Sequence, residues 1–300
     1  MSTDSAIRTR GLTKDFGGGN GLFDLDLDVE RGEIFGFLGP NGAGKSTTMR
    51  LLLDLIRPTA GSATVLGHDT RTDSLAVRRG VGFLPGDLAL FPKLTGNALL
   101  DFLGALHGGG NRRVRDALAE RFGAQLDRPV RELSTGNRQK IGLIQAFMHE
   151  PELVILDEPI AGLDPLVQQS FHELLREVAA EGRTVFLSSH TLSEVERVAH
   201  RVAILRRGRL VVVDTVDDLR NVAVQRLEIE FAGTPPETEL RSVPGVVAVA
   251  TEGSRVVVSF EGTADALVKA ISRHDVRSIR SRDADLEEIF LRYYREDDEP

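Results

Sequence analysis

Gly39–Thr47 reads GPNGAGKST, the stretch that decides the fold. It fits the pattern of a glycine, four residues of any type, glycine, lysine, and serine or threonine. The apolar run Ile34–Leu38 precedes it and predicts a buried strand, and Lys45–Ile56 follows it and predicts a helix. A strand, a glycine-rich loop and a helix in this order predict a site that binds phosphate.

Phosphate binding explains which residue types occur in this loop. Glycine at positions 39, 42 and 44 lets the backbone turn sharply and approach a phosphate group closely. The N–H groups of the loop and the positive end of the helix attract anionic oxygens. Lys45 supplies a mobile charge for the β- and γ-phosphates, and Ser46 offers a hydroxyl to Mg²⁺. The alternative to a phosphate-binding loop is a glycine-rich turn before an ordinary helix. Such a turn would not need to match every position of the motif, as this sequence does.

Length and composition limit the class of protein. The chain has 300 residues, enough for two domains, and 41% hydrophobic with 27% charged residues is typical of a soluble globular protein. A formal net charge of −8 argues against a nucleic-acid groove as the main surface. Without cysteine, disulfide and thiolate–metal chemistry are excluded. We find neither a signal peptide nor a run of about 18 apolar residues, so a partner would have to supply any membrane part.

Continuous apolar runs alternate with helical patterns through the first 220 residues. Such runs predict strands in a sheet that is covered on both faces, an α/β fold. Residues from about 87 to 150 predict an all-helical insert, in which Thr95 and Ser134 are expected to cap helices. The expected buried strands include Val81–Leu84, Leu153–Leu156, Thr184–Leu187 and Val202–Leu205.

The pattern changes after Arg220. From Leu227 to Ile279, short alternating runs and two helical patterns predict the order β-α-β-β-α-β, a small ferredoxin-like α+β unit. A further helix is expected after the capping pair Asp285 and Glu288, followed by a solvated acidic tail. We therefore expect one domain over residues 1–220 and an accessory domain over residues 221–300.

Asp157 and Glu158 end one of the buried strands, downstream of the phosphate loop. Asp157 is expected to help hold Mg²⁺ through its water shell, and Glu158 to polarise the attacking water. Phosphoryl transfer requires positioned charge more than covalent help, so these groups suffice. Alone, such an acidic pair would indicate no more than the cap of a strand end.

These motifs together resemble the ATP-binding subunit of an ABC transporter, a P-loop NTPase, over Ile7–Arg220. GPNGAGKST corresponds to the Walker A loop and LVILDE, Leu153–Glu158, to Walker B. Residues 161–164 match the loop that crosses to a second nucleotide-binding domain. LSTGN, Leu133–Asn137, matches the signature loop, with Thr135 and Asn137 as departures from the usual LSGGQ.

The resemblance implies a set of site residues. Glu158, His190 and Lys45 would act in catalysis, His190 as the histidine that reads the γ-phosphate rather than as an ordinary histidine at a strand end. Phe16 would stack on adenine, although it could equally be a core or rim aromatic. ATP would be bound by Phe16, Gly39, Pro40, Asn41, Gly42, Ala43, Gly44, Lys45, Ser46, Thr47, Ser134 and Gly136, and Mg²⁺ by Ser46, Asp157 and Asp87. Gly86 stands where the family has a glutamine, so Asp87 either replaces that ligand or caps a turn.

The resemblance also implies partners. A single domain and the ending Leu286–Phe290 resemble the drug-resistance type of subunit, which includes daunorubicin-resistance-like exporters. We expect an ATPase that drives efflux through a separate integral-membrane permease, located at the cytoplasmic face of the cell membrane, in a homodimer or with a sister subunit, and without nucleic acid. Leu88, Leu90 and Phe91 would either contact the permease or pack inside the insert. The alternative is a soluble ABC ATPase with a non-transport or regulatory role.

Overall fold

The computed structural model describes residues 5–108, 111–222 and 225–282. The chain divides into two compact units, residues 1–213 and 214–300, so the division falls before the boundary expected after residue 220. The helix expected after Asp285 and the acidic tail lie outside the described residues. Within the described residues, no helix is both long enough and apolar enough to cross a membrane.

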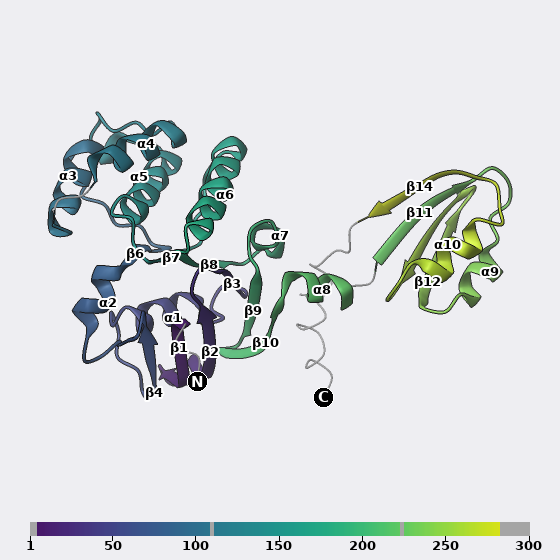
Figure 1. The fold of residues 1–300 in the computed structure, drawn as a ribbon, viewed down its shortest axis with the longest axis horizontal. Helices are drawn as coiled ribbons and strands as arrows, with labels where there is room; N and C mark the ends of the chain where they lie inside the picture. The colour runs from purple at the N-terminus through teal and green to yellow at the C-terminus, as the bar shows by residue number, and fades with distance from the viewer. Residues whose placement is uncertain (1–4, 109–110, 223–224, 283–300) are drawn as a thin grey trace. The chain divides into compact units, whose positions relative to one another are not determined.

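A largely parallel sheet forms the centre of the first unit (Figure 1). Its order is β10-β9-β3-β8-β7-β6, and β3 lies between β8 and β9, parallel to both. Every residue of β3, β7 and β8 is buried, which confirms that helices and a second sheet cover both faces. The strands are β3 (Ile34–Leu38), β6 (Val81–Leu84), β7 (Leu153–Asp157), β8 (Thr184–Ser189), β9 (Arg201–Arg206) and β10 (Arg209–Thr215).

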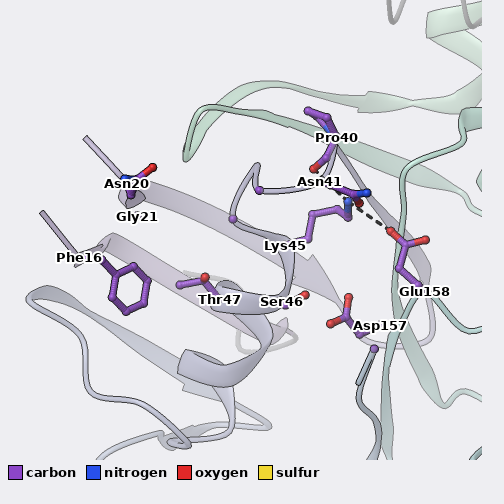
Figure 2. Close-up of a pocket in the computed structure, with 13 residues that line it drawn as sticks. Phe16, Asn20, Gly21, Pro40, Asn41, Lys45, Ser46, Thr47, Asp157 and Glu158 are labelled. Carbon is purple, nitrogen blue, oxygen red and sulfur yellow. Dashed lines mark hydrogen bonds and ion pairs between the residues drawn. The ribbon is translucent and has the colours of Figure 1, made fainter. Parts of the chain in front are cut away.

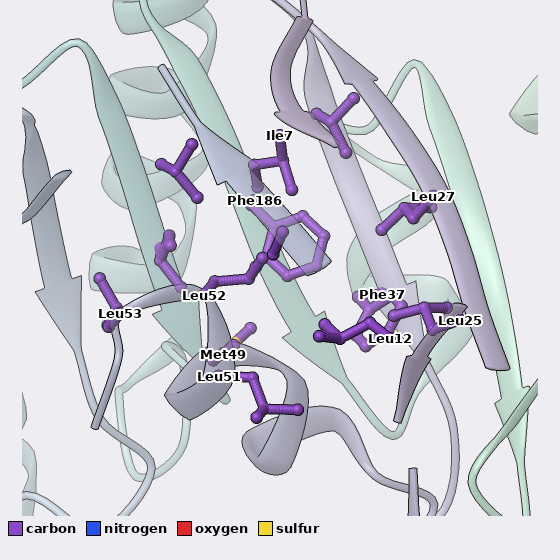
Figure 3. Packing of buried hydrophobic residues seen from close by; sticks show 14 of the residues in the cluster. Ile7, Leu12, Leu25, Leu27, Phe37, Met49, Leu51, Leu52, Leu53 and Phe186 are labelled. Atoms are coloured by element: carbon purple, nitrogen blue, oxygen red, sulfur yellow. The ribbon is translucent and has the colours of Figure 1, made fainter. Parts of the chain in front are cut away.

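A second, antiparallel sheet has the order β2-β1-β4-β5. It contains β1 (Ser5–Asp15), β2 (Gly21–Glu30), β4 (Ala60–Val65) and β5 (His68–Asp69). Inward-facing residues of this sheet pack with residues of the central sheet and of the first helix in one apolar core, which includes Ile7, Leu25, Phe37, Met49 and Phe186 (Figure 3). This core fixes the strand ends from which the site is built.

Helix α1 (Lys45–Leu52) is shorter than the expected helix over Lys45–Ile56. Asp54 has a φ of 54°, a left-handed conformation that stops the helix. Three further helices that the sequence analysis does not single out are α2 (Ser74–Gly80), α6 (Pro165–Ala180) and α7 (Leu192–Glu196). Their short loops return the chain to the parallel strands.

The predicted helical insert between β6 and β7 is confirmed. It contains α3 (Gly96–Leu106), α4 (Arg112–Phe122), the short 3-10 helix Val130–Glu132, and α5 (Thr135–Phe147). Thr95 and Ser134 cap α3 and α5 as expected, since their side chains accept the N–H groups of Ala98 and Asn137. On α3, Leu99 is buried but Phe102 and Leu106 are exposed, which leaves apolar surface on the insert.

The described part of the second unit begins with α8 (Val216–Val222) and then follows the order β-α-β-β-α-β. Its elements are β11 (Gln225–Phe231), α9 (Glu237–Ser242), β12 (Val246–Glu252), β13 (Arg255–Phe260), α10 (Asp265–Ile271) and β14 (Val276–Arg282). The sheet order is β12-β13-β11-β14, and its own core includes Ile229, Leu240, Val258 and Leu267.

Two histidines of the first unit make its stability depend on pH. Burial lowers the pKa of His149, and the neighbouring His107 lowers it further; burial also lowers the pKa of His172, with Arg197 and Arg176 adding to the effect. Below a pH of about 6.5 the unfolded chain binds protons that these folded histidines do not, so the free energy of unfolding decreases as pH falls.

We therefore expect the melting temperature to drop as pH is lowered from 6.5 towards the folded pKa values. The double variant His149→Gln/His172→Gln should show a shallower drop in circular dichroism melts. His68→Gln, at an exposed histidine, should melt like the parent chain. An equal slope in the double variant would contradict this assignment.

Candidate active site

A cleft of about 470 Å³ lies where β3, β6 and β7 end at the edge of the central sheet (Figure 2). Ligands of α/β proteins bind at this edge, because loops after the strands meet there. Most of the residues predicted for a nucleotide line it. The lining residues are Phe16, Asn20, Gly21, Pro40, Asn41, Gly42, Gly44, Lys45, Ser46, Thr47, Gly86, Asp157 and Glu158.

The loop between β3 and α1 opens the N-terminus of that helix to the cleft. Gly44 is the N-cap residue, with a φ of 111° that favours glycine, and it has no side chain that could cap the helix. The first-turn N–H groups, which have no partner within a helix, are therefore available to an anion. Ser46 and Thr47 lie on this turn, Gly39 directly follows the preceding strand, and Ala43 is buried.

Lys45 is the cation of the cleft and is only 6% exposed. Its Nζ donates to the carbonyl oxygens of Gly39, at 2.5 Å, and Pro40, at 3.3 Å. The same Nζ lies 3.3 Å from Oε1 of Glu158, and Figure 2 shows the two side chains directed toward one another. The loop thus holds the ammonium group beside the carboxylate.

Asp157 and Glu158 are placed by the pairing of β7 with β8. Asp157 is opposite Ser188 in the register, and its Oδ1 accepts the Ser188 hydroxyl at 2.6 Å. The Ser188 oxygen accepts the N–H of Glu158 at 3.1 Å. Oε2 of Glu158 lies 2.8 Å from Nδ1 of His190, the first residue after β8. The sequence motifs assign no role to Ser188. Its place near the end of β8, the strand beside β7, is the feature that could have indicated one.

The residues present fit Mg²⁺ in part. The Ser46 hydroxyl and the Asp157 carboxylate are the hard oxygen donors that this ion prefers, and both line the cleft. Within the described residues, no group of three or more histidine, aspartate and glutamate side chains could hold a metal ion.

Asp87 does not belong to this donor set. It is exposed and is not among the residues that line the cleft, so its replacement of the family's glutamine ligand stays a prediction beside the alternative that it caps a turn. The preceding Gly86 explains the difference, since a β-carbon at Gly86 would lie 3.0 Å from Oδ2 of Asp157. The backbone itself approaches the carboxylate there, and the chain carries Asp87 out to solvent.

Phe16 lies at the far end of the cleft from Glu158 and is 59% exposed (Figure 2). It is therefore not a core residue. The Nζ of Lys14 lies 5.4 Å from the centre of its ring. Asn20 and Gly21 line the cleft beside Phe16, and sequence reasoning missed both. A tight turn brings Asn20 there, since the N–H of Phe16 donates to its carbonyl oxygen at 2.9 Å.

Ser134 and Gly136 lie at the start of α5 and do not line this cleft. Gly136 instead packs against the loop after β7, where a β-carbon on it would lie 2.7 Å from the carbonyl oxygen of Gly162. Asn137, a departure from the usual signature, is buried. Its Oδ1 accepts the N–H of Gln125 at 2.7 Å, and its Nδ2 donates to the carbonyl of Gln125 at 2.9 Å. This departure therefore ties α5 to the segment before it.

Comparisons with known proteins agree with this geometry. The family model described as ABC transporter matches residues 22–161. A daunorubicin resistance ATP-binding protein of Streptomyces coeruleorubidus is 40% identical over 222 residues, which cover 72% of this chain and 70% of that protein. A daunorubicin/doxorubicin resistance ATP-binding protein of Streptomyces peucetius is 32% identical over 302 residues, 95% of this chain and 91% of that protein.

A solved structure of the ATP-binding subunit of an ABC transporter matches with a TM-score of 0.67 at 31% identity, covering 72% of this chain and 92% of that one. The phosphate loop, the acidic pair at the end of β7 and these matches lead to the same assignment. The chain belongs to the ATP-binding subunits of ABC transporters, a family of ATPases that hydrolyse ATP.

Proposed function

We propose that this chain is the ATP-hydrolysing subunit of an exporter and converts magnesium ATP to ADP and phosphate. The observation that carries the proposal is the position of the Glu158 carboxylate, between Lys45 at 3.3 Å and His190 at 2.8 Å, at the edge of the cleft. Phosphoryl transfer depends on positioned charge, and these three side chains place charge of both signs at one point.

Each residue then has a role. The α1 N-terminus and Lys45 bind the phosphates, and Phe16 stacks on the base. Ser46 and Asp157 would hold the magnesium ion, which would neutralise negative charge on the phosphate oxygens. Glu158 orients and polarises the attacking water, and His190 contacts the γ-phosphate.

Two copies of this chain, or this chain and a sister subunit, would enclose two ATP molecules. Support comes from Ser134 and Gly136, which present a capped helix start outside the chain's own cleft. A helix start of this kind suits the phosphates of a nucleotide on a second subunit. In a homodimer this arrangement is isologous.

An integral-membrane permease would be the second partner, which places the chain at the cytoplasmic face of the cell membrane. A groove of about 270 Å³ offers it a surface, with apolar lining from Leu53, Leu55, Phe83, Pro85, Leu103, Leu106 and Met148. Of the residues expected to form the contact, Leu88 is turned inward, since a β-carbon on Gly142 of α5 would meet it at 2.7 Å. Phe91 is 55% exposed and packs edge-on against Phe102.

Exchange of two exposed apolar residues tests this contact. The double variant Phe91→Ser/Leu106→Ser should abolish co-purification with the permease and export, because both side chains are exposed and apolar and Leu106 lines the groove. Nucleotide affinity should remain within about twofold, since neither residue lines the cleft. Val211→Ser, at an exposed valine of β10, is the matched control and should export normally. Normal export by the double variant would contradict the docking site.

Reconstitution tests the function as a whole. The relatives named above are resistance proteins, so export of an amphiphilic drug by vesicles that contain the chain and its permease is the expected result. The product of an adjacent gene is the first permease to test. Turnover that does not respond to the permease would favour the alternative, an ABC ATPase with a regulatory or non-transport role.

A further inference from the structure

Glu158 has an uncommon backbone conformation. Its φ is 50°, in the left-handed region that non-glycine residues seldom adopt. Such a conformation persists only where neighbouring groups hold it in place. On its N-terminal side the Glu158 N–H donates to the Ser188 hydroxyl at 3.1 Å. A second contact is therefore needed on its C-terminal side.

Gln139 of α5 supplies that contact. Its Nε2 donates to the carbonyl oxygen of Pro159 at 2.9 Å and lies 3.5 Å from the carbonyl oxygen of Glu158. These two carbonyl groups belong to the residues on either side of the Glu158–Pro159 peptide bond. This amide group and the N–H of Ala161, which donates to the Glu158 carbonyl oxygen at 3.3 Å, together fix the backbone whose orientation aims the Glu158 side chain at Lys45 and His190.

Ser134 caps the start of the same helix. The contact of Gln139 therefore joins the segment that begins at Ser134 to the segment that carries Glu158. Gly136 packs closely on Gly162, and Nζ of Lys140 lies 3.9 Å from Oδ2 of Asp164. Asp164 in turn caps α6 by accepting the N–H of Val167 at 3.1 Å. The first two turns of α5 and residues 158–164 therefore pack together, and Gln139 is the residue of α5 that contacts the backbone beside Glu158.

From this packing we infer that Gln139 is a positioning residue for the hydrolysis reaction. Gln139 holds the peptide after Glu158 so that the Glu158 carboxylate faces the cleft. The orientation of this carboxylate therefore depends on the position of α5. The inference rests on the proposed role of Glu158. When a nucleotide on a second subunit fixes the start of α5, Gln139 transmits that position to the carboxylate of its own subunit.

ATPase kinetics of the full chain test this inference. Gln139→Met keeps the length of the side chain but removes the donor, and should lower kcat about tenfold, which corresponds to one lost hydrogen bond. The dissociation constant for ATP, measured by calorimetry, and the melting temperature should stay close to the parent values. Gln139→Lys returns an N–H donor and should recover part of the lost kcat. Gln169→Met, at an exposed glutamine of α6, is the matched control.

The outcomes separate the possible failures. Parental kcat in Gln139→Met overturns the inference, as does an equal loss in Gln169→Met. A loss of kcat accompanied by weaker ATP binding and a lower melting temperature, without rescue by lysine, would show that the residue only supports the fold and also overturns it. Absence of ATP hydrolysis by the parent chain would instead remove the proposed function of Glu158 itself.

Discussion

Glu158→Gln should lower ATP turnover by at least about 100-fold, within the range that general base catalysis contributes. Glutamine has the shape of glutamate, so the packing at the end of β7 remains. It has no negative charge, however, and cannot polarise the attacking water. The substitution also removes the carboxylate 3.3 Å from Nζ of Lys45, which frees that ammonium for phosphate oxygens. ATP affinity should therefore be retained or increased.

Release of phosphate measures the first effect and calorimetry with ATP the second. The matched control is Glu152→Gln, at an exposed glutamate that pairs with Arg31 on the surface just before β7. Such exposed pairs contribute little, so the control should turn over ATP normally. Turnover by Glu158→Gln at the parental rate would overturn the role of this carboxylate.

The same variant reports on assembly. With hydrolysis blocked, ATP should remain bound, and two chains held together by ATP should accumulate. Gel filtration with ATP is expected to show a dimer, and without nucleotide a smaller species. A variant that binds ATP but stays monomeric at high concentration would count against the enclosure of nucleotide between two subunits.

Much of the site was predictable because its residues are close in sequence or at the ends of apolar strands. The phosphate loop is one contiguous motif between a strand and a helix, and the structure brings it to the cleft with Asp157 and Glu158. The capping roles of Thr95 and Ser134 were also predictable, since a cap depends on residues three positions apart.

Contacts between distant segments were not predictable in this way. The contact of Gln139 with the carbonyl of Pro159 crosses from the insert to the loop after β7, and nothing in either local pattern indicates it. The choice between the two roles expected for Asp87 could not be made from its position in the motif, which says nothing about the close approach of Gly86 to Asp157. Asn137 was recognised as a departure, but its pairing with Gln125 required the packing of the whole insert.

Lys45→Ala should weaken ATP binding by about 30- to 100-fold, the equivalent of about 2 to 3 kcal/mol for hydrogen bonds to charged phosphate oxygens. Lys45 is 6% exposed, so its charge acts at close range and with little screening. Truncation also leaves the Gly39 and Pro40 carbonyls without this donor, which could lower stability. A melting curve should therefore accompany each binding measurement.

Lys93→Ala, at an exposed lysine of the insert, is the control and should bind ATP normally. Because the N–H groups of the α1 N-terminus remain in Lys45→Ala, residual affinity is expected. Affinity equal to that of the parent chain, in a variant that melts normally, would mean that the triphosphate is bound elsewhere.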